Sequence, residues 1–563
     1  MVKNILTITV IAVASIVPYI ASLQGDFVWD DTEIIHDNDV IAKVHNPAQL
    51  LDRPFGSQNT GLATNYYRPV SSLSFWINSA LSESLSPSSF RMTNLIMHTL
   101  ACLLFYALLL LVLDTKEAFA GALIFAVHPM HVPNVAWISG RQDILCAIFI
   151  FLSLILYLRG IQENGRTRLF HILSLLIFVL ALGSKELAVV YPGVLLIILF
   201  YRADWDIRRT WNELQKGYMT AGIVILAIYI LIHQSITVGT GQAVSFSDHG
   251  LEITRILLNI AYYVYHMCVP WIQLDFQFAV PGLINMNTIY YLIALSLAVI
   301  FAALSVVFRW HRISLAFLWL AIFIIPVSGI IPVKSNYSAA LHIVYLAVGA
   351  ISIAAGQIVR SVLDRWENKQ WLSVTIFVLV ICALTLATHT HSRNWENETD
   401  LFTYLSEVGG SSHAAALLGN TYWNAGEIEK SEESFRLALR RDQTEVAAWF
   451  GLGRLEASKK NLDLAERYLK NSLQKPGPTN SYSYNNLGNI YYLRQEYSKA
   501  YELYHKSLRT NPYNYIAMYN AGQTALKLQQ AQDAAHFLRK FIDNATSEYN
   551  HQKNRARLQL KKL

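Results

Sequence analysis

Long apolar runs separated by short polar loops occupy the first two-thirds of the chain. A helix needs about 20 apolar residues to cross a bilayer, and eleven runs are candidates. They begin near Ile5, Met92, Ala118, Ile144, Leu169, Leu187, Tyr218, Thr288, Ile313, Leu341 and Trp371. The first run, which follows a short polar N-terminus, could alternatively be a cleaved signal peptide. Either interpretation exports the loop that follows it.

The loops between these runs alternate between two kinds. Basic loops occupy 159–168, 201–209, 309–312 and 359–369, whereas the other loops contain the motifs DD, HPMH, SGRQD, SKE and PVKSNYS. The positive-inside rule assigns the basic loops to the cytoplasm, with the N-terminus inside and the C-terminus outside. The run at 253–271 would break this alternation if it crossed, so we predict an interfacial or half-inserted helix there. The first outer loop is then 24–91.

Past residue 390 the apolar runs give way to a charged sequence with an internal repeat. The pairs LG, LG, LG and AG recur at 418, 452, 487 and 521, a spacing of 34 to 35 residues. A small residue follows each pair at Ser431, Ala465, Ala500 and Ala534, and a large one at Phe435, Leu469, Tyr504 and Leu538. This period is typical of tetratricopeptide repeats. We therefore predict an all-α chain, with a polytopic membrane domain at 1–389 and about four repeats at 390–563.

Composition agrees with a membrane protein that does not bind nucleic acid. Of the 563 residues, 53% are hydrophobic and only 15% are charged. The excess of Lys and Arg (45) over Asp and Glu (39) is spread over small loops, whereas nucleic acid requires one concentrated basic face. The four cysteines lie in apolar runs without metal-ligand spacing, so we predict neither a disulfide framework nor a resident metal or cofactor.

Ionisable residues collect in the loops predicted to lie outside, where proximity to a bilayer makes them costly unless they serve a function. They are Asp30, Asp31, Arg68, His128, His131, Arg141, Asp143, Lys185, Glu186, Lys334 and His342, with Tyr345 nearby. Each has a simpler interpretation. The two aspartates could cap an interfacial helix, His128 could end a span, and Lys185 and Glu186 could form a local ion pair. The two histidines of HPMH could bind a divalent metal, although no carboxylate stands at a fixed spacing from them.

Together these motifs resemble a known family. FVWDD, NYYRPVSSLSFWIN, FRMTNLIMHTL, HPMHVPNVAWISGRQD and SKE occur in the order found in TMTC-type transmembrane and tetratricopeptide-repeat proteins, which resemble protein O-mannosyltransferases of the glycosyltransferase C fold. The resemblance implies a polyprenyl-phosphate sugar donor and a reaction on the outer or luminal face. It also maps the proposed catalytic acidic pair onto Asp30 and Asp31. Pro133 and Leu341–His342 depart from the family pattern, which leaves the sugar and its phosphate contacts open.

Transfer from a lipid phosphate requires a base for the acceptor hydroxyl and cations for the leaving phosphate. We predict Asp30 as the base, Asp31 as its orienting neighbour, and Arg68, Arg141 and Lys185 as phosphate ligands. The donor and acceptor pocket is predicted to comprise His128, His131, Asp143, Glu186, His342 and Tyr345. The expected reaction moves a sugar, mannose in the family, to Ser or Thr hydroxyls of exported proteins with inversion. A glycan or lipid acceptor, or a non-catalytic scaffold, are the alternatives.

The repeats are predicted to hold the protein acceptor. Asn486 and Asn520 precede the third and fourth pairs and could bind a peptide backbone, although Leu417 and Gly451 occupy the equivalent positions in the first two copies. The alternative is that these asparagines only cap or solvate helices. A short repeat array favours a prokaryotic inner-membrane protein with its site and repeats outside. In a eukaryote the corresponding location is the endoplasmic reticulum, with the site in the lumen.

Overall fold

A computed structural model of the chain describes residues 2–43, 45–56, 66–82, 85–162, 167–214, 216–237, 253–271, 277–278, 296, 311–329, 339–475, 477, 479–545 and 549–563. Across these residues the structure is helical, apart from β1 (Gln277–Phe278) and β2 (Ala339–Ala340), which pair antiparallel. The chain divides into two compact units, Met1–Gly56 with Thr64–Leu401, and Ser57–Ala63 with Phe402–Leu563. The boundary predicted after residue 389 lies within α16 (Gln370–Arg393), shortly before this division.

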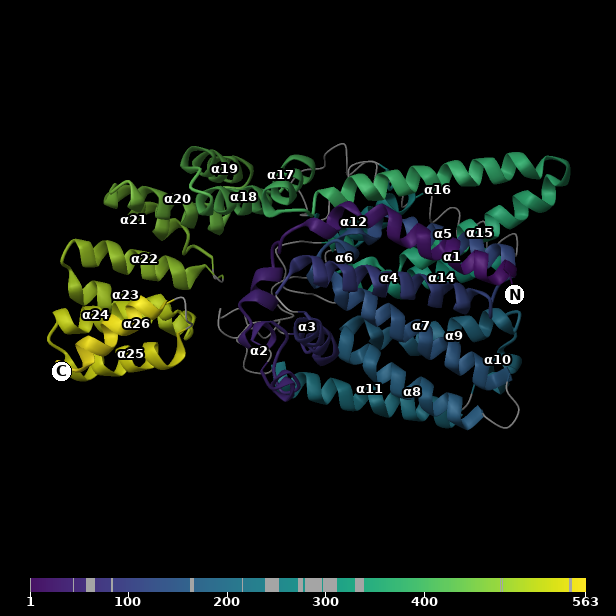
Figure 1. Cartoon of the computed structure of the whole chain (residues 1–563), viewed down its shortest axis with the longest axis horizontal. Helices are drawn as coiled ribbons and strands as arrows, with labels where there is room; N and C mark the ends of the chain where they lie inside the picture. Colours follow the sequence, from purple (N-terminus) through teal and green to yellow (C-terminus); the bar gives the residue numbers. More distant parts are fainter. Residues whose placement is uncertain are drawn as a thin grey trace. The chain divides into compact units, whose positions relative to one another are not determined.

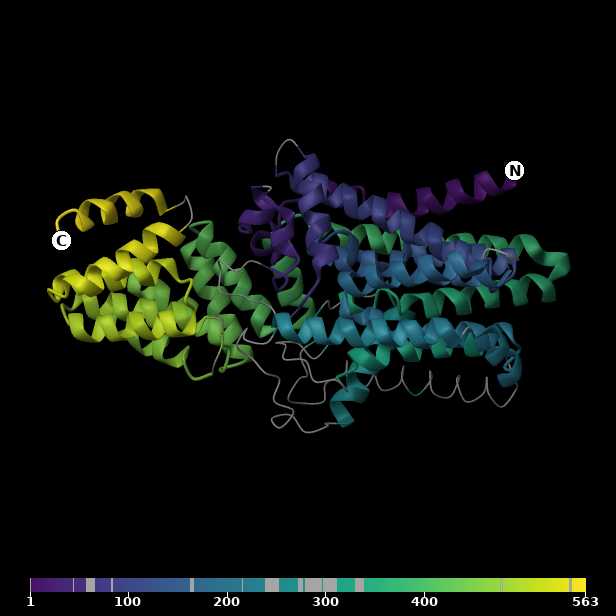
Figure 2. The ribbon, with the colours of Figure 1, turned by 90° about the horizontal axis from the view of Figure 1, so that it is seen from below.

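The first unit is a bundle of long apolar helices (Figures 1 and 2). Its helices are α1 (Val2–Ile16), α4 (Pro87–Leu109), α5 (Thr115–Val127), α7 (Arg141–Gln162), α8 (Thr167–Ser184), α9 (Tyr191–Arg202), α11 (Lys216–Thr237), α14 (His311–Ile324), α15 (Val348–Arg365) and α16. Within the described residues, five helices are long and apolar enough to span a membrane, or six if α5 and the bent helix after it are one span. The predicted span near Thr288 lies outside the described residues. The protein is a multi-pass membrane protein, and the count of eleven spans stays a prediction.

The two kinds of loop lie at opposite ends of this bundle. At one end, near the N-terminus, Arg202 donates to the carbonyl of Leu111 (2.6 Å) and Arg360 pairs with Asp114 (3.5 Å). Helix α10 (Ile207–Glu213) and the turn between α15 and α16 lie at this end, whereas α2 (Asp39–Ala42), α3 (Pro69–Leu81) and α6 (Val132–Val135) lie at the other (Figure 1). In the part of the chain that the structure describes, the two kinds of loop that alternate along the sequence are therefore separated in space, with the basic loops at one end and the motif-bearing loops at the other.

The first outer loop folds around a small apolar core of its own. Its buried side chains are Ile34, Ile35, Val40, Ile41, Leu50, Phe55, Phe75, Phe90 and Ile138. Removing a buried phenylalanine from such a core costs about 3–5 kcal/mol, because a cavity remains after its apolar contacts are lost. This core fixes the paired aspartates, which precede Ile34, against α3, α4 and the segment before α7.

Helix α12 (Ile253–Cys268) packs on the bundle through one face. Tyr262 and Tyr263 are fully buried, and Asn259 donates to the carbonyl of Ser328 (2.8 Å). Its 16 residues correspond to about 24 Å, less than the roughly 30 Å of a bilayer core. The interfacial or half-inserted placement of this helix stays a prediction.

The second unit contains four helix pairs with the predicted period. They are α18 (Ser412–Asn424) with α19 (Ile428–Arg441), α20 (Val446–Ser458) with α21 (Leu462–Asn471), α22 (Asn480–Leu493) with α23 (Tyr497–Thr510), and α24 (Tyr515–Lys527) with α25 (Ala531–Asn544). Helix α17 (Glu398–Gly409) precedes them and α26 (Asn550–Leu560) follows. In each pair, a glycine of the first helix packs against a large side chain of the second helix. A Cβ at Gly419, Gly453, Gly488 or Gly522 would lie 2.6–2.8 Å from Phe435, Leu469, Tyr504 or Leu538. The predicted helix–helix contacts are confirmed.

The turn inside each pair requires a left-handed residue. Gly426 fills it in the first repeat (φ 79°), but Lys460, Gln495 and Gln529 fill it in the others with φ of 60–66°. A side chain in this conformation destabilises the folded chain by about 1–2 kcal/mol relative to glycine. Part of the advantage of glycine is offset, because its unfolded chain has more conformational freedom to lose on folding.

We therefore expect Gln495→Gly to stabilise the third repeat by about 0.5–1 kcal/mol. Gln495 is exposed, so no packing is lost. Amide hydrogen exchange of α22 and α23 in the full chain should slow by about two- to fivefold. The matched control, Gly426→Ala, should speed exchange in α18 and α19. Equal exchange in Gln495→Gly and the parent would contradict the argument.

Candidate active site

Asp31 is the most tightly held side chain of the acidic pair. It is fully buried, and Ser139 donates to it through both its backbone N–H (2.8 Å) and its Oγ (2.6 Å). The N–H of Val28 is a third donor (3.2 Å). Burial raises the pKa of Asp31 to about 6, although the bonds from Ser139 and the charge of Arg91 act in the opposite direction. These contacts suit the predicted orienting role better than proton transfer to a substrate.

Asp30 differs from its neighbour because it is only half-buried. The residue before it, Trp29, adopts a left-handed φ of 57°, which is strained for a bulky side chain and recurs at functional sites. Trp29 stacks on Trp137 with ring centroids 5.2 Å apart, and Trp137 stacks on Trp395 at 5.8 Å. This aromatic stack fixes the backbone on which Asp30 is presented.

A third carboxylate, Glu33, lies on the same turn and was not singled out from the sequence. It is half-buried, and burial, together with the charges of Asp30 and Asp37, raises its pKa to about 7. A base with such a pKa is well matched to neutral pH. Glu33 is therefore a second candidate base in the same segment.

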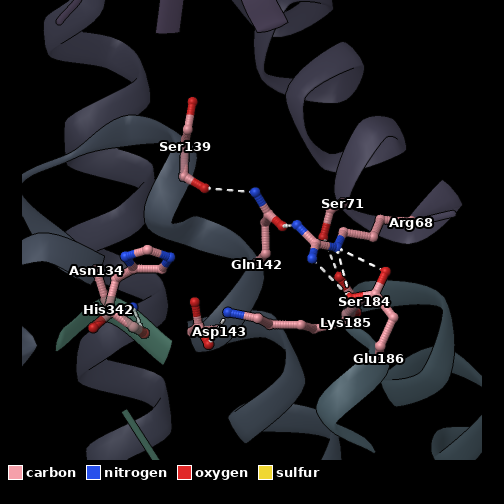
Figure 3. Close-up of polar contacts among 10 residues, drawn as sticks. All are labelled: Arg68, Ser71, Asn134, Ser139, Gln142, Asp143, Ser184, Lys185, Glu186 and His342. Carbon is pink, nitrogen blue, oxygen red and sulfur yellow. Dashed lines mark hydrogen bonds and ion pairs between the residues drawn. The ribbon is translucent and has the colours of Figure 1, made fainter. Parts of the chain in front are cut away.

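A chain of hydrogen bonds leads from Asp31 to Arg68, one of the cations predicted to bind phosphate, and Figure 3 shows it from Ser139 onward. Ser139 bonds Asp31 through its hydroxyl, and its carbonyl accepts from Gln142 (2.9 Å). Gln142 in turn accepts from Arg68. Arg68 holds Glu186 in a bidentate pair, with Nη2 to Oε2 at 2.7 Å and Nε to Oε1 at 3.0 Å. Three loops distant in sequence are thereby joined.

A second ion pair lies beside this chain. Lys185 bonds Asp143 at 2.5 Å, and both side chains are buried. His342, whose carbonyl accepts from Asn134 (2.7 Å), points its ring toward the space next to this pair (Figure 3). Burial alone would lower the pKa of Arg68 and raise that of Glu186. The attraction between them reverses both shifts, so each stays charged.

Arg141 is fully enclosed by protein groups. It donates to Asn94 (2.6 Å), Asn78 (2.8 Å) and the carbonyls of Ser74 (3.2 Å) and Phe90 (2.8 Å). Its guanidinium also lies 4.6 Å from the centroid of Phe75. These contacts leave little of the group for a substrate phosphate. The geometry therefore favours a structural role for Arg141, in place of the phosphate contact expected from the sequence.

Arg91, which was not among the predicted site residues, connects the N-terminal and C-terminal segments of the first unit. Its guanidinium donates to the carbonyls of Ser22 (2.8 Å), Asp26 (2.5 Å) and Trp395 (2.8 Å). Together with the Trp29–Trp137–Trp395 stack, it fixes the start of the first outer loop to the end of α16. The sequence signal that could have identified Arg91 is its place in the FRMTNLIMHTL motif.

His128 and His131 lie in a buried aromatic cluster rather than beside the ion pairs. His128 accepts from the N–H of Met130 (3.3 Å), so it caps the turn after α5, as the simpler interpretation held. His131 packs on Tyr345 with ring centroids 4.2 Å apart, and the Tyr345 hydroxyl bonds His98 (2.7 Å). Among the described residues, no group of three or more His, Cys, Asp or Glu side chains could hold a metal ion. Lys334 lies outside the described residues.

The two asparagines of the repeats contact neighbouring repeat residues. Asn520 donates to Asn485 and Asn489 of the preceding repeat, both at 3.0 Å, and Asn489 approaches Asn486 at 3.5 Å. The Asn520 amide therefore links two repeats, which favours the structural interpretation over the predicted peptide contact. Both side chains remain half-buried.

Comparison with known proteins agrees with the resemblance seen in the sequence. Residues 68–233 match the family model described as dolichyl-phosphate-mannose-protein mannosyltransferase, and 417–481 and 481–514 match tetratricopeptide-repeat models. The chain is 27% identical over 467 residues to protein O-mannosyl-transferase F38B6.6 of Caenorhabditis elegans, covering 77% of this chain and 64% of that protein. It is 22% identical over 619 residues to human protein O-mannosyl-transferase TMTC3, covering 97% and 65%.

Among solved structures, the apo oligosaccharyltransferase of Archaeoglobus fulgidus aligns with a TM-score of 0.41 and 12% identity, over 74% of this chain and 59% of that chain. This likeness is too low to support an argument. The chain spans slightly less than two-thirds of the length of the two relatives named, 64% and 65%. The chain therefore combines a region similar to dolichyl-phosphate-mannose-protein mannosyltransferases with tetratricopeptide repeats, and over most of its length it is similar to protein O-mannosyl-transferases that include human TMTC3.

Proposed function

We propose that this protein transfers mannose from a polyprenyl-phosphate donor to Ser or Thr hydroxyls of exported proteins, with inversion at the anomeric carbon. The observation that carries the proposal is the hydrogen-bonded chain from Asp31 through Ser139 and Gln142 to Arg68. It connects a carboxylate segment to buried cations at one end of the membrane unit. This pairing of base and cation is what transfer from a lipid phosphate requires.

In the proposed step the acceptor hydroxyl oxygen attacks the anomeric carbon of the donor sugar. The bond from that carbon to the phosphate oxygen breaks, and its electron pair leaves with the polyprenyl phosphate. The hydroxyl proton passes to the Asp30 carboxylate, with Asp31 and Ser139 holding the backbone that presents it. Because the phosphate is a stable anion once it leaves, no general acid is needed on that side.

Lys185 and Arg68 are the proposed ligands of the leaving phosphate. Both are buried, and each is already positioned by a carboxylate partner. A prearranged cation stabilises developing charge without first reorganising, which is the main source of electrostatic catalysis. Arg141 is not included, because its contacts are with protein groups.

Protein is the proposed acceptor because the relatives are protein O-mannosyl-transferases by name. The repeats would present the polypeptide, with the site and the repeats both outside the cytoplasm. A glycan or lipid acceptor uses the same chemistry and differs only in the group offered to Asp30. A purely structural role would not explain buried ion pairs gathered at one end of the unit.

We expect Asp30→Asn to lower kcat for mannosyl transfer by about 10²–10⁴-fold, because the amide keeps the size but does not accept the proton. The affinity for the donor should be retained. Asp31→Asn is the matched comparison, and Glu33→Gln tests the alternative base. Near-normal transfer by Asp30→Asn with loss in Glu33→Gln would move the base to Glu33.

At low pH, the rate of transfer should depend on the protonation of Asp31. Transfer should fall as pH drops through about 6, because protonation of Asp31 breaks its charged contact with Ser139. Hydrogen bonds to a charged group are worth about 1.5–3 kcal/mol, and Ser139→Ala removes the hydroxyl donor while the backbone donor remains. The pKa of Asp31 should then rise further, and the acid limb of kcat/KM should move up by about one pH unit. A Ser71→Ala control, which removes a bond to the carbonyl of Ser184, should leave the limb in place.

Orientation is tested independently of activity. We expect a periplasmic or luminal reporter fused after Leu563 to be active, because the alternation of basic loops predicts an external C-terminus. A fusion after Lys369, in the turn between α15 and α16, is the internal control and should be inactive. Activity of a cytoplasmic reporter after Leu563 would refute both the orientation and the odd number of spans.

A further inference from the structure

Helix α11 is the most lipid-exposed long helix that approaches the ion pairs. Only 6% of its apolar window is buried, and its side chains Ile228, Ile230, Leu231 and Ile232 are 42–65% exposed. Tyr229 and His233 lie one turn apart on this helix, with ring centroids separated by 5.9 Å. Both are half-buried. Polar side chains within a membrane helix are costly and are usually retained for a function.

The depth of Tyr229 follows from the packing of α11 against α8. The two helices lie side by side and begin at the same end of the bundle, the end that carries α10 (Figures 1 and 2). Near that end Ser174 of α8 bonds the Tyr218 hydroxyl of α11 (2.9 Å). Tyr229 follows Tyr218 by as many residues as Lys185 follows Ser174, and both helices rise 1.5 Å per residue. Tyr229 therefore lies at the depth of Lys185 and Glu186.

Two further observations place these side chains on the ion-pair side of α11. The Tyr229 hydroxyl and the His233 ring both interact electrostatically with Arg68 and Glu186. The Tyr229 hydroxyl is nevertheless buried without a hydrogen-bond partner in the part of the chain that the structure describes. A buried hydroxyl left unpaired is destabilising, so a ligand that accepts from it would recover that cost.

We propose that Tyr229 and His233 form the lipid-facing half of the donor site. In this arrangement the Tyr229 hydroxyl donates to the phosphate of a polyprenyl-phosphate sugar, and Arg68 and Lys185 hold the phosphate from the protein side. The isoprenoid chain lies along the exposed apolar residues of α11. A donor anchored in the bilayer reaches the ion pairs sideways, so a lipid-exposed helix at their depth is where its phosphate enters. This inference rests on the proposed function.

The test measures binding of polyprenyl phosphate, without its sugar, to the full-length protein in phosphatidylcholine nanodiscs. Wild type should bind it more tightly than the uncharged polyprenol. Tyr229→Phe should weaken the binding of polyprenyl phosphate by about tenfold, the equivalent of one hydrogen bond to a charged group, and leave polyprenol binding unchanged. Tyr106→Phe is the matched control, since Tyr106 lies on α4 (Pro87–Leu109), near the opposite end of the bundle, and should not alter the affinity.

Kinetics separates this inference from the proposed reaction. With a sugar-charged donor, Tyr229→Phe combined with His233→Gln should raise KM for the donor while kcat at saturating donor stays within about twofold of wild type. Unchanged affinity and KM in both variants would overturn the inference and leave the proposed function intact. Wild type that binds polyprenyl phosphate but transfers no sugar would overturn the proposed function alone. Wild type that does not distinguish polyprenyl phosphate from polyprenol would overturn the inference.

Discussion

Charges removed from water must be matched by opposite charges or by several hydrogen bonds, and one end of the membrane unit is organised by this requirement. Arg68 is paired with Glu186, Lys185 with Asp143, and Arg141 with amide and carbonyl groups. Each of these contacts joins segments far apart in sequence. The loops are therefore held together by the neutralisation of their own ionisable groups. Removing one partner would leave a buried charge uncompensated, at a cost of about 3–5 kcal/mol.

The helical architecture could be predicted because it depends on periodicities that the sequence displays directly. A run of apolar residues sets the length of a spanning helix, and the candidate spans that fall on described residues are helical. In the repeats, spacing alone placed Gly488 and Tyr504 at recurring positions, and the structure shows that the glycine packs against the tyrosine where the two helices touch. The left-handed turn residues Lys460, Gln495 and Gln529 escaped notice, because nothing in their side chains requires that conformation.

The sequence indicated which residues gather near the candidate site, but not which of them bond to one another. The alternation of loops indicated which ionisable residues share one end of the bundle, and the ion pairs lie there. It did not indicate that Arg141 would be enclosed by Asn94 and Asn78, since those asparagines stand on other segments with no local signal. The same holds for Asn520, whose partner Asn485 lies one repeat away. Ser139 and Gln142 were visible only as part of the SGRQD motif. Pairwise geometry across segments is a tertiary property, which spacing along one chain does not encode.

The charge balance of the two ion pairs constrains how a phosphate could be accepted. The charges of Arg68, Lys185, Asp143 and Glu186 cancel, so an arriving anion meets a neutral cluster rather than a vacant cation. A cation must therefore share its partner. Arg68 is held in a planar bidentate pair and would lose both bonds by turning away, whereas the Lys185 ammonium has three donors and one carboxylate contact. Lys185 can thus keep Asp143 while it contacts a phosphate, whereas Arg68 can contact it only through the N–H groups that Glu186 and Gln142 do not occupy. In the proposed reaction both cations therefore contact the leaving phosphate while each keeps its carboxylate partner.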